Sequence, residues 1–264
     1  MPFLALQFWL IAVFIFALGA VVGSFLNVVI SRLPGGDSII FPASRCPKCT
    51  ASIRWYDNIP IISFILLHRR CRNCHALIAW QYPAVEALMG FMAVALFTEF
   101  LLSFPFIIYF VFAAALLAVI FIDFSHQIIP DAITLPGIVL GFVFSFANPL
   151  VSWQDSGLGI LFGGGSLYLV ALGYFLLTRR EGMGGGDIKF LGMLGAFLGW
   201  QSLPFVLFAS SLFGTIIGIG AMVKQKKGGK TVIPYGPFLA MAALFFLFFR
   251  ERIFFYMDLL FSRN

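Results

Sequence analysis

Long apolar runs separated by short polar segments dominate the chain. Runs with few or no charged residues cover 3–30, 84–102, 105–122, 132–146, 158–177, 188–200, 203–223 and 233–249. A helix that crosses a bilayer needs roughly 20 apolar residues, and fewer where the bilayer thins. Two of the runs, 132–146 and 188–200, are short. The pattern predicts an all-α polytopic membrane protein with about eight transmembrane helices, with seven as the alternative.

The composition agrees with a membrane protein. The chain is 61% hydrophobic, only 11% charged and contains 34 phenylalanines, which excludes an ordinary soluble domain. The first run has no basic start and no Ala-x-Ala-like exit, and it is about twice as long as the apolar region of a signal peptide. We therefore expect it to stay in the protein as a helix.

The basic residues predict the orientation in the membrane. If the runs alternate in direction, 14 of the 17 Lys and Arg residues fall on one side: those in 32–72, 179–180 and 224–230, together with Lys189. The positive-inside rule makes this side cytoplasmic and places both termini outside. The formal charge of +6 then reflects topology and contact with anionic lipid, and predicts no nucleic-acid binding.

All four cysteines lie in the largest polar stretch, residues 31–82. They form two C-x-x-C pairs, Cys46-Pro-Lys-Cys49 and Cys71-Arg-Asn-Cys74, with 21 residues between them. Two such pairs at this separation are typical of a closed, tetrahedral Zn²⁺ site. The alternatives are two disulfides or free thiols, but a reducing cytoplasm disfavours stable disulfides. We expect His75, the neighbour of Cys74, to stay outside a site that already has four thiolates.

Two aspartates lie at the ends of apolar runs, where a carboxylate is costly and usually marks a functional site. Asp123 ends the third run, and Asp187 follows three glycines at the start of the sixth. The predicted alternation brings both to the cytoplasmic side, so the two carboxylates can share one depth. The glycines allow the backbone to unwind and to approach another helix closely. We interpret the pair as a candidate catalytic dyad for peptide hydrolysis.

Simpler roles for the acidic residues stay open at this point. Asp187 could be a helix N-cap and Asp123 could anchor a loop. Asp131 follows a proline and opens the next run, so a role as helix cap or support is expected for it. Glu86 could pair with an arginine or line a substrate path.

Several motifs, in their order along the chain, resemble those of the type IV prepilin peptidases, which are G-x-G-D intramembrane aspartyl proteases. They are Gly23-Ser24-Phe25-Leu26-Asn27, Arg32-Leu33-Pro34, the paired C-x-x-C, Asp123, Gly184-Gly185-Gly186-Asp187 and Ile233-Pro234-Tyr235-Gly236-Pro237-Phe238. The resemblance covers nearly the whole chain and depends on motifs that occur together in the same order.

The resemblance implies a bifunctional bacterial inner-membrane enzyme. Such enzymes cut the leader from type IV prepilins or type II secretion pseudopilins on the cytoplasmic side, and then methylate the new N-terminus with S-adenosylmethionine. By position, Asp123 and Asp187 would be the protease pair. Cys46, Cys49, Cys71 and Cys74 would bind the metal. No motif of soluble methyltransferases is present, so the sequence assigns no residues to S-adenosylmethionine.

The implied domains are a first transmembrane helix (1–30), a cytoplasmic four-cysteine zinc domain associated with methylation (31–82) and a transmembrane aspartyl peptidase domain (83–264). Two other function classes remain. A membrane thiol oxidoreductase would use the C-x-x-C pairs as redox couples but leaves both aspartates without a role. An ion- or proton-coupled transporter would use the aspartates but leaves the cysteines unexplained.

Overall fold

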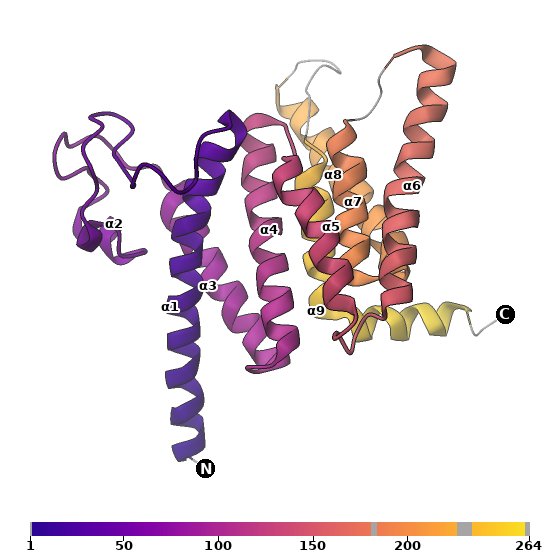
Figure 1. Ribbon diagram of the computed structural model, residues 1–264, viewed down its shortest axis with the longest axis horizontal. Coiled ribbons are helices and arrows are strands. Elements are labelled where there is room, and N and C mark those ends of the chain that lie inside the picture. Colours follow the sequence, from indigo (N-terminus) through magenta and orange to yellow (C-terminus); the bar gives the residue numbers. More distant parts are fainter. Residues whose placement is uncertain (1, 181–183, 226–233, 262–264) are drawn as a thin grey trace. The chain divides into compact units, whose positions relative to one another are not determined.

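The computed structural model describes residues 2–180, 184–225 and 234–261 (Figure 1). Over these ranges the regular elements are helices, and no strand is found apart from two isolated bridges in the cysteine segment. The helices are α1 (Pro2–Arg32), α2 (Ile62–Leu66), α3 (Gln81–Phe100), α4 (Phe104–His126), α5 (Asp131–Ser145), α6 (Trp153–Thr178), α7 (Gly185–Leu198), α8 (Leu203–Gln225) and α9 (Gly236–Phe261). The basic residues 226–230, Ile233 and Arg263, which entered the sequence predictions, lie outside the described residues.

Five helices in the described part of the chain are long and apolar enough to cross a bilayer. They correspond to α1, α3, α4, α6 and α8, and α5 is a shorter apolar helix. Each of the five long helices coincides with one of the apolar runs, because an apolar run of 18 or more residues is long enough to cross the bilayer as a helix. The all-helical membrane class is therefore confirmed, whereas the count of eight crossings stays a prediction.

The chain divides into two compact units, Met1–Ala118 and Val119–Asn264, with the boundary inside α4. In the first unit, glycines bring α1 and α3 into close contact. A Cβ placed on Gly19 would lie 2.7 Å from the carbonyl oxygen of Met89, and one on Gly23 would lie 2.7 Å from the Cα of Glu86. Small residues of this kind let helix backbones approach each other in an apolar environment.

In the second unit, α7 packs between α5 and α6. A Cβ on Gly159 would lie 2.2 Å from the carbonyl oxygen of Gly195, so the α6 and α7 backbones touch. On the other side, a Cβ on Gly137 of α5 would overlap the side chain of Met193. All nine residues from Phe190 to Leu198 are buried, as expected of a helix that is apolar on every face. A central position explains why the run that forms α7 is short.

Helix α9 extends beyond its apolar run. The sequence pattern ends near residue 249, but α9 continues to Phe261 after a break at Phe249, whose φ and ψ are −115° and 18°. After this break the helix turns aside (Figure 1). Arg250 follows the break and donates a 2.6 Å hydrogen bond to the carbonyl of Leu150. This bond holds the turned segment near the loop between α5 and α6.

Candidate active site and metal centre

Asp123 lies in the last turn of α4, and its side chain is only 5% exposed. Its Oδ2 accepts a 3.1 Å hydrogen bond from the backbone N–H of Gly236, at the start of α9. A Cβ on Gly236 would lie 2.6 Å from that Oδ2, so only glycine leaves space for the carboxylate. This contact explains a glycine of the Ile233–Phe238 motif that sequence reasoning had not connected to Asp123.

Asp187 lies in the first turn of α7 and is partly buried. The N-cap of α7 is Gly184, not Asp187, and no side chain caps it. The simpler reading of Asp187 as an N-cap is therefore wrong, because the helix begins earlier than the apolar pattern indicates. Asp187 is free to face other groups.

The structure brings the two aspartates together within the second unit. Their carboxyl groups are close enough to interact electrostatically. Ile129 connects the segments that carry them, since Cβ atoms on Gly186 and Gly236 would lie 3.1 Å from its Cβ and 2.9 Å from its Cδ1, respectively. Small residues beside both carboxylates thus let α4, α7 and α9 meet at one point. Two carboxyl groups whose charges interact are the candidates for a catalytic dyad.

Asp131 has a different place from the two aspartates of this pair. It is the first residue of α5, after the N-cap Pro130, and its Oδ2 lies 2.6 Å from Lys189 Nζ. The expected supporting role therefore takes the form of an ion pair between α5 and α7, which sequence reasoning missed. Both side chains are substantially exposed, so the pair contributes at most about 1 kcal/mol.

The four cysteines form two arms with the same backbone pattern, 25 residues apart. In each arm the first cysteine N–H donates to an alanine carbonyl (Cys46 to Ala51, Cys71 to Ala76), and its own carbonyl accepts from the residue four positions on. Those residues, Thr50 and His75, both have a left-handed conformation, with φ of 57° and 56°. The repeat is also visible in the sequence, because residues 45–53 and 70–78 both read Arg-Cys-x-x-Cys-x-Ala-x-Ile.

The geometry of the thiols suits a single metal ion. The four sulfur atoms lie within 4.8 Å of one another, and Cys46 Sγ and Cys74 Sγ are 3.8 Å apart. Tetrahedral coordination with Zn–S bonds of about 2.3 Å would place the sulfurs about 3.8 Å apart. All four cysteines are free thiols, which excludes the two-disulfide alternative for this structure. His75 is not part of the cluster, as expected.

Backbone dipoles prepare two of these thiols to bind a cation. The N–H of Ala51, helped by Asn73, lowers the pKa of Cys49 to about 6. The N–H of Cys74 similarly lowers the pKa of Cys71. For Cys74 the N–H of Ala76 also acts to lower the pKa, but desolvation and the neighbouring thiols raise it to about 11. A bound metal ion would favour the thiolate form of every ligand.

The cysteine segment has almost no apolar core of its own. Among residues 31–82, only Cys46 and Ser63 are buried. A segment of this size without a core usually needs a metal or disulfides to hold one conformation. The arrangement of donors and the missing core therefore both fit a structural metal ion.

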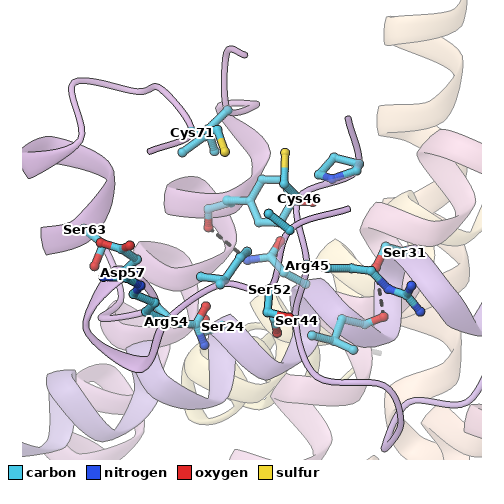
Figure 2. A pocket seen from close by; sticks show the side chains of 18 of the residues that line it. Ser24, Ser31, Ser44, Arg45, Cys46, Ser52, Arg54, Asp57, Ser63 and Cys71 are labelled. Carbon is cyan, nitrogen blue, oxygen red and sulfur yellow. Dashed lines mark hydrogen bonds between the residues drawn. The ribbon is translucent and has the colours of Figure 1, made fainter. Parts of the chain in front are cut away.

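Glu86 is buried in α3 and does not pair with an arginine in the described part of the chain. Its Oε2 accepts a 2.8 Å hydrogen bond from the Ile61 N–H, and the Ser24 hydroxyl also bonds to it. Glu86 lines a cavity of about 950 Å³ beside the cysteine arms (Figure 2). Figure 2 shows Cys46 and Cys71 at the top of this cavity and Ser24 of α1 below them.

Family models and known proteins match this sequence along most of its length. Residues 17–100 match the family model of the Bacterial Peptidase A24 N-terminal domain, and residues 110–219 match that of the Type IV leader peptidase family. Proteins named prepilin leader peptidase/N-methyltransferase are 38% identical in Myxococcus xanthus (83% of this chain, 66% of that protein) and 36% identical in Aeromonas hydrophila (93% of both). No solved structure gives a significant match.

These matches cover both compact units. A third relative of the same name, in Pseudomonas aeruginosa, is 35% identical over 259 residues and 89% of each chain. The matched ranges include the four cysteines, Asp123 and Asp187. Together with the paired aspartates and the clustered thiols, they show that this chain belongs to the type IV leader peptidase family.

Proposed function

We propose that this protein is a bifunctional processing enzyme of the bacterial inner membrane. It removes the leader peptide from type IV prepilins or type II secretion pseudopilins, and it then methylates the new N-terminal residue. The observation that carries the peptidase half is that Asp123 and Asp187 lie in one unit and that their charges interact. The names of the relatives support both halves. The oxidoreductase and transporter alternatives each leave one of the two sites without a role.

The dyad would work by acid–base catalysis. One carboxylate, in its ionised form, takes a proton from the attacking water, while the other donates a proton to the leaving amine. The titration belongs to the pair, so neither aspartate is assigned one fixed role. The N–H of Gly236 would orient the Asp123 carboxylate, and burial would exclude all but a few water molecules.

The domain organisation proposed here follows the sequence predictions. Residues 1–30 form the first membrane helix, 31–82 a cytoplasmic zinc domain and 83–264 the peptidase, with about eight crossings in all. Zinc is proposed for the cysteine cluster because four thiolates in a tetrahedral arrangement favour it. S-adenosylmethionine would supply the methyl group.

The function is tested with purified protein in detergent and a prepilin substrate. Mass spectrometry should show loss of the leader and, when S-adenosylmethionine is added, gain of one methyl group on the new N-terminus. Cleavage without methylation would refute the second activity alone. No cleavage of any prepilin or pseudopilin tested, by protein that retains its fold, would refute the peptidase.

Thiol labelling at the two ends of α6 tests the proposed topology. An impermeant thiol reagent added outside should label a cysteine at Ala147, which is exposed before α6, but not one at Arg180 after it. Unmodified protein is the control, because its four native thiols lie on the proposed cytoplasmic side. Labelling at Arg180 from outside would invert the orientation.

Substitution of Gly236 tests how Asp123 is held. A Cβ there would meet Asp123 Oδ2 at 2.6 Å and Ile129 Cδ1 at 2.9 Å, so Gly236→Ala should displace the carboxylate. Because a misplacement of about 1 Å can cost roughly 10²-fold in rate, we expect cleavage to fall by about that factor. Steady-state cleavage of a prepilin is the measurement.

The matched control is Gly173→Ala in α6, where a Cβ would meet nothing within 4 Å. It should cleave like the unchanged protein. Normal cleavage by Gly236→Ala, at equal expression, would contradict the positioning of Asp123 by this glycine.

A further inference from the structure

The cavity beside the cysteine arms has the size and the chemistry of a ligand site. Its volume of about 950 Å³ is at the upper end of the range for small-molecule sites, roughly 300–1,000 Å³. It is lined by α1, α3 and the polar segment between them, all within the first unit. Aromatic side chains such as Phe41, Phe64 and Tyr82 contribute to the wall. Polar side chains such as Ser24, Ser52 and Asp57 line the same space (Figure 2).

One polar atom in this wall is unpaired. Asn27 is 3% exposed, and its Nδ2 donates a 3.1 Å hydrogen bond to the Tyr82 carbonyl, which fixes the amide. Its Oδ1 is buried and has no partner among the described residues. Leaving a buried acceptor unpaired is destabilising, so such an atom usually serves a ligand or a water molecule.

A second group in the wall carries charge. The carboxylate of Glu86 is 7% exposed and has only neutral donors, the Ile61 N–H and the Ser24 hydroxyl. None of the five basic residues that line the cavity forms an ion pair with Glu86: Arg72 pairs with Asp57, Arg54 contacts Tyr56, Arg32 donates to backbone carbonyls, and neither Arg45 nor Lys48 bonds to Glu86. A buried carboxylate without a protein cation favours a ligand that brings a positive charge.

We propose that this cavity binds the methyl donor, S-adenosylmethionine, with the Glu86 carboxylate facing the positively charged sulfonium and Asn27 Oδ1 accepting a hydrogen bond from one of the N–H groups of the same molecule. The inference rests on the proposed methyltransferase function. The donor fits the three observations together, because it is a small molecule with a flat aromatic base, several N–H donors and a permanent positive charge. Cys46 and Cys71 line the same cavity, so the cysteine cluster would shape the wall of the donor site.

Calorimetric titration of the full-length protein with S-adenosylmethionine tests the assignment. We expect Glu86→Gln and Asn27→Leu each to weaken binding by about tenfold or more, since the first removes the negative charge that faces the sulfonium and the second removes the hydrogen-bond acceptor. S-adenosylhomocysteine lacks the charge on sulfur, so Glu86→Gln should weaken its binding less. Glu99→Gln is the matched control, because Glu99 lies on the same helix α3 but is exposed and outside the cavity.

Ultraviolet cross-linking of labelled S-adenosylmethionine gives a second readout, and the label should map to peptides within residues 24–86. Unchanged metal content and unfolding temperature without ligand would show that the variants fold. Unchanged affinity in both folded variants, an equal loss in Glu99→Gln, or a label within residues 119–264 would overturn the site. Equal losses for both ligands in Glu86→Gln would overturn the role of its charge. If the unchanged protein bound no donor at all, the methyltransferase function itself would fail.

Discussion

Asp123→Asn and Asp187→Asn are each expected to eliminate prepilin cleavage. An amide can neither take a proton from water nor exchange the proton that the proposed dyad would share. General acid–base catalysis contributes roughly 10²–10⁴-fold, and the loss of one member of a coupled pair can cost more. Time courses of leader release, followed by mass spectrometry, measure the effect.

Both variants should still insert, bind metal and methylate a pilin whose leader has already been removed. Replacing a carboxylate by an amide of the same shape removes charge repulsion within the pair and leaves the packing of α4 and α7 intact. Asp131→Asn is the matched control, because its ion pair with Lys189 is exposed and contributes little to stability. It should lose less than about tenfold in rate. Near-normal cleavage in either Asp123→Asn or Asp187→Asn would refute the aspartyl mechanism.

Replacing Cys46 and Cys49 together by serine should remove the metal from the protein. Serine is a poor ligand for zinc, and two remaining thiolates cannot complete a tetrahedral site. Since residues 31–82 bury almost no apolar side chains, the segment should also lose its fixed conformation. Elemental analysis of the purified protein gives the metal content, and limited proteolysis reports on the segment.

Methylation should suffer more than cleavage, because the cysteine arms lie in the first unit and the paired aspartates lie in the second. His75→Ala serves as the control and should keep its metal, as His75 is outside the thiol cluster. Wild-type protein that carries no metal while its thiols are intact would refute the zinc proposal. Equal losses of both activities would mean that the cysteine segment also supports the peptidase.

The apolar pattern predicted where helices form, because a membrane allows few other ways to satisfy the backbone. The spacing of the cysteines predicted their clustering for a similar reason, since a metal site restricts the possible ligand distances. The extension of α9 to Phe261 was missed, because residues after the break at Phe249 include charges that end the apolar run. Local patterns thus predicted which segments form helices better than they predicted the residues at which those helices begin and end.

Contacts between distant segments could not be predicted from local patterns. The bond from the Gly236 N–H to Asp123 joins residues 113 positions apart, and the Asp131–Lys189 ion pair joins residues 58 positions apart. Both depend on how α4, α5, α7 and α9 pack. The unpaired oxygen of Asn27 was equally hidden, because burial and a missing partner are properties of the folded state.

Because Gly159 contacts Gly195, we expect the surrounding lipid to influence the relative positions of the two aspartates. With 26 residues, α6 is about 39 Å long, which exceeds the hydrocarbon thickness of roughly 30 Å. A helix that is too long for the bilayer tilts, and the tilt changes with bilayer thickness. Because the α6 and α7 backbones touch without intervening side chains, we expect α7 to follow this tilt and to carry Asp187 with it. We therefore expect acyl chain length in the host membrane to alter the separation of the two carboxylates.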